Sequence, residues 1–490
     1  MMTYHPFLDG TPKRLFIDGD WRESITGETF DCFNPSTGAV LTRVARGGVA
    51  DIDAAVAAAR RAFEGDWGNW KPFERQSLLL KVVDLIERRF DDLSRLETLD
   101  MGAPIARTSL FKRWIRQTFQ YYAALAVGNR GEVFSNSVPG DFMSYSLKVP
   151  LGVVGAIIPW NGPLITQLWS ICPTLATGCT LVLKPAEEAP LSALMMAEIL
   201  KEAGVPDGVI NVVPGPGATA GAALAGHVGV DKITFTGSTT TGRKIVEASA
   251  ANMKRVSVEL GGKSPDIVFE DADFEAAALG AAMACFNNTG QICYAGTRLF
   301  VQRSIYERFV QRVAEVGNTL KIGDSLDPAT QLGPLASQAQ LERVKHYFDV
   351  ANADGARLVS GGVQLGGDLA GGYFVPPTVL ADVHNDMRIA QEEVFGPVLA
   401  AIPFDHEDEV LRLANETGYG LGGGVWSRDV GRVHRITRSL RCGMAWANCY
   451  GVTDPSVTFT GAKLSGYGVK GGPWHLDEYL LNKTVWLNLG

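Results

Sequence analysis

The sequence has no excess of positive charge and no long apolar run. Its 45 lysine and arginine residues stand against 53 aspartate and glutamate residues, for a net charge of −8. Nucleic acids and anionic membranes attract basic surfaces, so we expect neither as a partner. The most hydrophobic stretch, residues 151–160, is far shorter than the ~20 residues a membrane-spanning helix needs. Residues 1–16 contain no apolar core of signal-peptide length, so we expect a soluble, cytoplasmic protein.

Cysteine and histidine are also scarce, with seven of each. The cysteine count is odd, the positions are scattered, and no two have CxxC spacing, so the sequence predicts neither a disulfide framework nor a zinc site. The histidines form no HExxH or other ligand cluster, so no metal ion is expected. Reduced thiols are typical of a reducing compartment. The cysteines are Cys32, Cys172, Cys179, Cys285, Cys293, Cys442 and Cys449.

A third absence is a GxGxxG fingerprint between a predicted strand and the helix that follows it, the place it takes in dinucleotide-binding folds. Residues 215–221 come close but have one residue too many. Residues 235–242, Phe-Thr-Gly-Ser-Thr-Thr-Thr-Gly, make a better phosphate cradle, because they follow a predicted strand and open a predicted helix. The ordinary alternative is that Ser238 only caps that helix.

What is present is a globular composition with alternating strands and helices. Of the 490 residues, 46% are hydrophobic and 20% charged, and this length predicts two or three domains. Such alternation is typical of an α/β fold with a parallel sheet covered on both faces. The predicted strands are 153–158, 180–183, 209–213, 232–235 and 256–258, and the helices between them are 164–177, 191–202, 218–224 and 240–250. Long helices are predicted upstream over 52–63, 74–99 and 110–127. A second alternating region begins at residue 267, with helices over 274–285, 305–320, 341–353 and 409–417 and strands over 299–301 and 423–426.

Two segments supply a nucleophile and a base. The first is Asn287-Asn-Thr-Gly-Gln-Ile-Cys293 and the second is Glu259-Leu-Gly-Gly-Lys263. A cysteine thiolate adds to a carbonyl carbon and holds the product as a thioester, and a carboxylate activates the water that hydrolyses it. A lone cysteine is more often a small buried hydrophobe, so neither segment decides the function alone.

Further motifs stand in a fixed order along the chain, from Phe16-Ile-Asp-Gly-Asp-Trp21 and Asn34-Pro-Ser-Thr-Gly38 to Lys483-Thr-Val485. Between them stand Pro159-Trp160-Asn161, Lys184-Pro-Ala-Glu187, Phe235-Thr-Gly-Ser238, the two segments above, and Glu392-Glu-Val-Phe-Gly-Pro397. With this ordered set the chain resembles the aldehyde dehydrogenases almost end to end.

The resemblance implies an α/β fold in three parts. A Rossmann-like cofactor domain is expected from residues 1–127 and 149–262, and an α/β catalytic domain from 263–462. Residues 128–148 and 463–490 are expected to form a small β oligomerisation arm and tail. Family members are usually dimers or tetramers built through such arms, so a homodimer or homotetramer is expected.

The resemblance also implies a cofactor site. In the family a lysine and a glutamate, which correspond to Lys184 and Glu187 here, bind the adenosine ribose. The Glu187 carboxylate would repel the 2′-phosphate of NADP, so NAD is favoured over NADP. Without the family context a surface Lys–Glu pair is the simpler explanation. The expected cofactor contacts are Trp160, Lys184, Glu187, Gly217, Phe235, Gly237, Ser238, Leu260, Glu393 and Phe395.

For the chemical step the resemblance implies Cys293 as nucleophile, Glu259 as hydrolytic base and Asn161 as oxyanion donor. Each has an ordinary structural explanation: Asn161 as a helix cap, and Glu259 as a partner of Lys263. Cys285 is expected to be a core cysteine without a catalytic role. Two positions depart from the common family pattern: Thr460 stands where a glycine is usual, and Lys470 where a glutamate is common.

The expected substrate tunnel is wide. Gly162 and Thr453 stand where many family members carry aromatic residues, and the segments 162–169 and 451–459 contain neither arginine nor lysine. We therefore predict an uncharged, bulky, apolar aldehyde, aromatic or long and branched. The predicted tunnel residues are Gly162, Thr166, Trp169, Ile292, Tyr294, Thr453 and Phe459.

Two other functions stay open on the sequence alone. One is a cysteine esterase or thioesterase without redox chemistry, against which the cofactor segments argue. The other is a non-catalytic structural protein with the same fold, against which the joint presence of Asn161, Glu259 and Cys293 argues.

Overall fold

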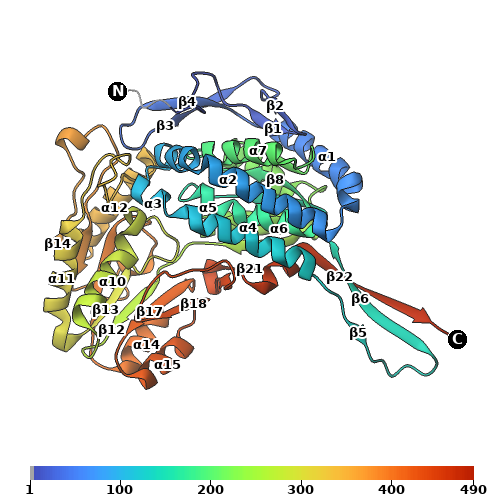
Figure 1. The fold of residues 1–490 in the computed structure, drawn as a ribbon. Helices are drawn as coiled ribbons and strands as arrows, with labels where there is room; N and C mark the ends of the chain where they lie inside the picture. The colour runs from blue at the N-terminus through green and yellow to red at the C-terminus, as the bar shows by residue number, and fades with distance from the viewer. Residues whose placement is uncertain (1–4) are drawn as a thin grey trace.

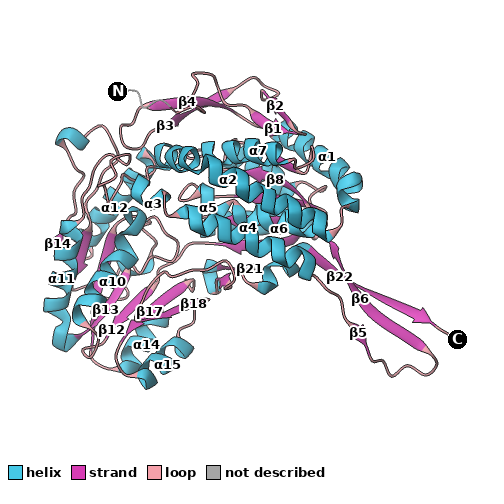
Figure 2. Ribbon diagram, in the orientation of Figure 1, coloured by secondary structure: helices cyan, strands magenta, loops and turns pink. Residues whose placement is uncertain are grey.

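A computed structural model describes residues 5–490. Two helix-covered sheets make up the body, and a thin β arm projects away from it, with the C-terminus near its tip (Figure 1). Figure 2 shows the strands of both sheets lying between layers of helices. Strands and helices alternate along the sequence, and this order produces the layers, because strands buried on both faces need helices on both sides.

The first sheet has eight strands in the order β2-β1-β9-β8-β7-β10-β11-β20. Strands β7 to β11 run parallel to one another, while β1, β2 and β20 add antiparallel edges. The strands are β1 (Leu15–Ile17), β2 (Asp20–Arg22), β7 (Val153–Ile157), β8 (Thr180–Lys184), β9 (Ile210–Val212), β10 (Lys232–Thr236), β11 (Arg255–Glu259) and β20 (Gly466–Tyr467).

Successive residues of these strands enter two different hydrophobic clusters. Val154 and Leu181 pack toward α2 (Pro72–Met101), α4 (Phe111–Gly128), α6 (Leu168–Thr177) and α7 (Leu191–Ala203). Val153 and Val182 pack toward α1 (Val49–Glu64), α8 (Ala222–Gly226) and α9 (Thr239–Ser249). The period of two places neighbouring residues on opposite faces of the sheet.

The second sheet has seven strands in the order β14-β15-β16-β13-β12-β17-β18, and only β14 runs antiparallel to its neighbour. The strands are β12 (Pro265–Val268), β13 (Arg298–Gln302), β14 (Arg357–Ser360), β15 (Thr378–Ala381), β16 (Val398–Phe404), β17 (Gly422–Trp426) and β18 (Met444–Ala447). One face carries α10 (Phe274–Phe286) and α11 (Tyr306–Thr319). The other carries α12 (Gln338–Ala353), α14 (Glu407–Asn415) and α15 (Val430–Ser439), with the short α13 (Arg388–Gln391) beside α12.

The arm is a three-stranded antiparallel sheet in the order β22-β6-β5. It consists of β5 (Val133–Phe134), β6 (Phe142–Pro150) and β22 (Leu480–Asn488). Two smaller pairs complete the strands: β3 (Thr29–Phe33) with β4 (Val40–Ala45), and β19 (Phe459–Thr460) with β21 (Val469–Lys470).

The α/β class with a helix-covered parallel sheet is confirmed, and several details differ from the prediction. The helix predicted over 164–177 is divided into α5 (Pro163–Thr166) and α6, with the change at Gln167. The helix predicted over 218–224 begins as a wider π-helical turn over Gly217–Gly221 before α8. The short strands β1 to β4 and β14 to β16 were not predicted. The domain boundaries stay a prediction.

No helix within residues 5–490 combines the length and apolar content that crossing a bilayer requires. In the same range, no three histidine, cysteine, aspartate or glutamate side chains are grouped to hold a metal ion.

Candidate active site

A cavity of about 730 Å³ collects residues from both sheets. The first sheet contributes the segments that follow β7, β10 and β11, and the second contributes the segments that lead into β13 and β16. Ligands of open parallel sheets bind beyond the carboxyl ends of the strands, where neighbouring connections diverge. Of the predicted site residues, the wall includes Trp160, Asn161, Gly162, Thr166, Trp169, Gly237, Ser238, Leu260, Glu259, Ile292, Cys293, Tyr294, Glu393, Phe395, Thr453 and Phe459.

Cys293 and Glu259 lie on facing parts of this wall. Cys293 is half-buried, and burial, together with the neighbouring Glu259 carboxylate, raises the pKa of its thiol well above the ordinary value. The resting thiol is therefore protonated, and its proton has to leave as the sulfur attacks. Burial also raises the pKa of Glu259, while Lys470, Cys293 and Thr236 oppose that effect. Glu259 does not pair with Lys263, so that ordinary explanation is wrong for the described residues.

Asn161 is fixed beside the nucleophile by a small amide network. Its side-chain N–H donates to the Gln291 carbonyl at 2.9 Å, and Asn288 donates to the Asn161 carbonyl at 3.1 Å. Asn288 and Thr289 have φ values of 53° and 55°, so the loop before Cys293 has a left-handed turn that non-glycine residues rarely adopt. Gly162, and not Asn161, is the N-cap of α5, so Asn161 has no helix-capping role. Its second amide N–H remains available to an oxyanion.

The phosphate cradle begins at the end of β10. Ser238 caps α9, because its hydroxyl oxygen accepts from the Thr241 N–H at 3.3 Å. The helix-capping role proposed for Ser238 as the ordinary alternative is therefore present. Other N–H groups of the first turn of α9 remain available on the side of the cavity. A Cβ on Gly237 would lie 2.6 Å from the Phe235 ring, which is buried below it. Phe235 therefore supports the cradle from beneath and does not line the cavity.

Three more predicted cofactor residues form a cluster outside the cavity wall. The Lys184 ammonium is buried and donates to Glu187 at 2.8 Å, and the Gly217 N–H donates to the other Glu187 oxygen at 2.8 Å. Burial raises the pKa of Glu187, but Lys184 and these hydrogen bonds outweigh it, so the net pKa is lowered and the side chain is ionised. Because Lys184 is buried, this is not a surface pair.

Of the remaining predicted cofactor residues, Glu393 and Phe395 precede β16 of the second sheet, whereas Trp160 and Leu260 follow β7 and β11 of the first. Glu393 accepts from the Gly262 N–H at 2.9 Å, and burial raises its pKa to about 7. A Cβ on Gly261 would lie 2.2 Å from Glu393, so glycine is needed for this approach. The rings of Phe395 and Trp160 meet edge to face with centroids 5.3 Å apart.

Comparison with known proteins identifies this arrangement. The model of the aldehyde dehydrogenase family matches residues 21–485. The chain belongs to the aldehyde dehydrogenase family. Aldehyde dehydrogenase 1 of Tanacetum cinerariifolium is 45% identical over 96% of this chain and 94% of that protein.

Solved structures agree with this assignment. The NAD⁺ complex of an aldehyde dehydrogenase from Bacillus cereus is 43% identical, with a TM-score of 0.96 over 99% of this chain and 98% of that one. The P. syringae indole-3-acetaldehyde dehydrogenase AldA, solved with NAD⁺ and IAA, is 42% identical, with a TM-score of 0.95 over 97% of each chain. The predicted family, enzyme class and fold are confirmed.

Other residues of this aldehyde dehydrogenase site were not predicted. Arg107 lines the cavity from α3 (Ile105–Thr108), together with Leu110, Phe111 and Trp114 from the start of α4. Segments 162–169 and 451–459 contain no cation, but Arg107 brings a positive charge to the wall of the same cavity. Little in the sequence marks Arg107, since it precedes the helix predicted over 110–127. Lys470 was noticed only as a departure from the family pattern.

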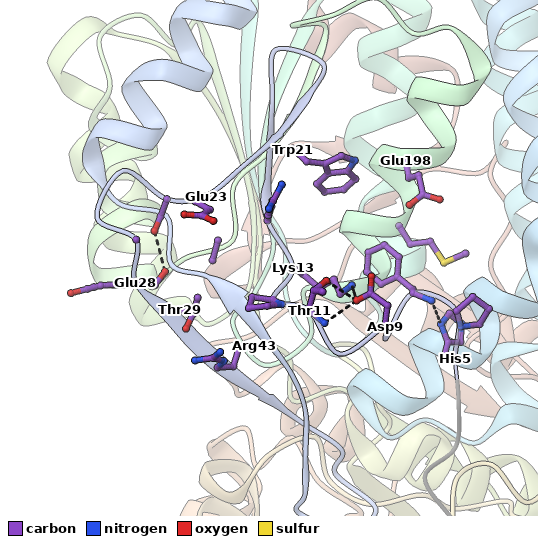
Figure 3. A pocket seen from close by; sticks show the side chains of 18 of the residues that line it. His5, Asp9, Thr11, Lys13, Trp21, Glu23, Glu28, Thr29, Arg43 and Glu198 are labelled. Carbon is purple, nitrogen blue, oxygen red and sulfur yellow. Dashed lines mark hydrogen bonds and ion pairs between the residues drawn. The ribbon is translucent and has the colours of Figure 1, made fainter.

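A second cavity of about 730 Å³ lies beside the N-terminal strands (Figure 3). Two ion pairs lie in its wall: Lys13 with Asp9 at 2.6 Å, and Arg89 with Glu198 at 2.7 Å. Within residues 5–490 none of the predicted site residues lines it. The candidate active site is therefore the cavity that holds Cys293.

Proposed function

We propose that this protein oxidises a bulky, mainly apolar aldehyde to its carboxylic acid with NAD as the hydride acceptor. The observation that carries the proposal is the convergence of Cys293, Glu259 and Asn161 on one cavity with aromatic walls. Such a cavity supplies a nucleophile, a base and an oxyanion donor within one enclosed space.

The residues of the first sheet fit NAD. The ionised Glu187, held by Lys184 and Gly217, is suited to accept from ribose hydroxyls, and the first turn of α9 is suited to a pyrophosphate. Glu393, fixed by Gly262, would hold the second ribose. When bound, NAD supplies the acceptor for the hydride that leaves the aldehyde carbon.

In the first half-reaction the Cys293 sulfur forms a bond to the aldehyde carbon while its proton passes to a water molecule. The carbonyl oxygen becomes an oxyanion, which the free Asn161 N–H and the Cys293 backbone N–H stabilise. Loss of one such donor typically lowers the rate by ~10²–10³. Departure of hydride from the carbon leaves a thioester on Cys293.

In the second half-reaction Glu259 takes a proton from water while the water oxygen attacks the thioester carbon. The carbon–sulfur bond breaks, the acid leaves, and the released Cys293 sulfur takes up the proton that Glu259 holds, which restores the thiol and the carboxylate. A hydrolytic base at this position separates the protein from the family branch that transfers the acyl group to coenzyme A. It also provides a route to esterase side activity at the same cysteine.

The cavity wall supports the substrate class. Trp169 and Phe459 lie with ring centroids 5.1 Å apart, and Tyr294 lies 5.9 Å from Phe459. A Cβ on Gly162 would meet no atom within 4 Å, so space is open there. The similar P. syringae enzyme is named for an aldehyde with an indole ring, which suits such a wall.

Arg107 supports a second candidate, an aldehyde with a polar or carboxylate group at its far end. One guanidinium N–H donates to Asn287 at 2.8 Å, whereas its buried Nε has no hydrogen-bond partner within residues 5–490. An aldehyde panel with matched neutral and carboxylate members, assayed with NAD and NADP, separates the two candidates.

The test of the mechanism compares Cys293→Ala with Glu259→Gln. Cys293→Ala should abolish both NADH formation and ester hydrolysis, since both need the sulfur. Glu259→Gln should keep one rapid burst of NADH per site and then stall, because the thioester forms but is not hydrolysed. Cys285→Ala, in the core of the second sheet, is the matched control and should retain turnover. Undiminished steady-state turnover in Glu259→Gln would refute the assignment of the base.

A further inference from the structure

A buried lysine stands behind the hydrolytic base. Lys470 is 6% exposed, and its ammonium donates to the Thr236 hydroxyl at 2.5 Å. The same ammonium lies 5.0 Å from the centroid of the Trp169 ring, which lines the substrate cavity. A buried ammonium is costly unless a negative charge or several acceptors face it.

The backbone places Lys470 between the base and the tunnel. Gly466 of β20 is the register partner of Glu259 on β11, and Lys470 of β21 is the register partner of Phe459 on β19. Thr460 donates to the Gly468 carbonyl at 2.8 Å and so ties the two short pairs together. The position of the ammonium is therefore fixed by strand pairing.

Thr236 connects this lysine to the base. It is the register neighbour of Glu259 in the parallel pair β10–β11, so their side chains share one face of the sheet. Its oxygen accepts from Lys470, which leaves its hydroxyl hydrogen free to point at the Glu259 carboxylate. Both Glu259 oxygens are buried and, within residues 5–490, lack a hydrogen-bond partner at normal geometry.

The other charged groups around this pair are already engaged or neutral. Lys232, which faces Lys470 from β10, pairs with Glu478 at 3.1 Å and donates to Ser257. Burial, together with Lys470 and Lys232, lowers the pKa of His475 well below its ordinary value, so that ring is neutral. Glu393 and the Cys293 thiol face Glu259 from the second sheet's side.

We propose that Lys470 is a positioning residue that keeps Glu259 ionised and aimed at the thioester, acting through the Thr236 hydroxyl. This inference rests on the proposed function, because it assigns Lys470 to the hydrolytic half-reaction. Burial alone favours a protonated Glu259, and a protonated carboxyl cannot take a proton from water. Lys470 opposes that tendency, since a nearby positive charge favours the carboxylate.

The sign of the pH effect follows from the charges. Removing Lys470 removes a stabiliser of the carboxylate, so Glu259 should ionise only at higher pH. Burial lowers the pKa of Lys470 to about 8, so the wild-type ammonium is charged at neutral pH, where the base must be ionised.

The experiment measures burst amplitude and steady-state NADH formation from pH 6 to pH 10 in the wild type, Lys470→Met, Lys470→Arg and Thr236→Val. Dividing the steady-state rate by the burst amplitude counts only folded, acylating sites. Lys470→Met should keep the burst, lose roughly tenfold or more of the pH 7 turnover per site, and recover as pH rises; a general base contributes ~10²–10⁴. Lys470→Arg should restore much of the loss, and Thr236→Val should resemble Lys470→Met.

Lys254→Met is the matched control, since it removes a buried lysine that donates only to the Ala225 and His227 carbonyls. It should leave the acidic limb of the turnover profile in place. The inference is overturned if, at the acidic end of the pH range, turnover per site in Lys470→Met follows the same curve as in the wild type. A wild type that forms no NADH from any aldehyde of the panel overturns the proposed function instead.

Discussion

At the scale of single residues, the buried neighbours of Cys293 and Glu259 set the protonation states of these two groups. Burial alone makes Cys293 a neutral thiol and favours a neutral Glu259. Lys470 and Thr236 oppose this at the base, and the Asn161 amide is held ready for the oxyanion. Without these neighbours, Glu259 would lack the charge, and Asn161 the side-chain orientation, that the proposed reaction requires.

We expect cofactor choice to depend on one residue, Glu187. Glu187→Ser removes a carboxylate that repels a 2′-phosphate, so it should narrow the ratio of kcat/KM between NAD and NADP. Steady-state assays with both cofactors measure the ratio. Glu188→Ser, at the exposed neighbouring position, is the control and should leave the ratio unchanged. A wild type that prefers NADP would contradict the role given to Glu187.

At the scale of elements, the connections after the strands build the wall of the Cys293 cavity, which we propose as the substrate tunnel. Gly162 opens α5 directly after the loop that carries Asn161, and its φ of 168° is extended backbone that any residue can adopt. Gly162→Phe should therefore fill open space without backbone strain. It should lower kcat/KM for a bulky aldehyde more than for acetaldehyde, since each lost methylene contact removes ~0.8 kcal/mol of binding.

Gly162→Ala is the graded control and should give a smaller difference between the two aldehydes. Kinetics with one aromatic aldehyde and acetaldehyde are sufficient for the comparison. Equal effects of Gly162→Phe on both substrates would contradict a wide tunnel at this position.

The elements also show what the sequence could predict. Short, mainly apolar runs such as residues 180–183 predicted central strands, here β8, because strands buried on both faces need hydrophobic residues on both sides. Short edge strands such as β20 and β21 have no such signal, and their pairing depends on contacts far along the chain. The sequence shows Lys470 only as a departure from the family pattern, because the pairing of β20 with β11, which brings it near Glu259, cannot be predicted from local residues. Arg107 was missed for the same reason, since its place in the cavity depends on how α3 packs.

At the scale of the whole molecule, the arm leaves the body with much of its surface uncovered (Figure 1). Strand β22 is at the edge of its sheet and pairs on one side only, with β6. Large apolar side chains on the arm are exposed: Val133, Phe134, Met143, Leu147, Leu481, Trp486 and Leu487. An open strand edge beside exposed apolar residues is a typical site for pairing with another chain. This supports the prediction of a homodimer or homotetramer built through the arm.

The paired substitution Leu481→Glu and Trp486→Glu tests this prediction. It places charges on two exposed apolar positions of β22 without touching the Cys293 cavity, because the strand belongs to a separate sheet. Sedimentation velocity should show the wild type as a dimer or tetramer and the variant as a smaller species. The NADH burst per chain should persist in the variant, since both catalytic segments lie in the body. Asn482→Glu, equally exposed on the same strand, adds charge without removing apolar surface and should keep the wild-type sedimentation. A monomeric wild type, or a variant that sediments like the wild type, would show that β22 does not hold the subunits together.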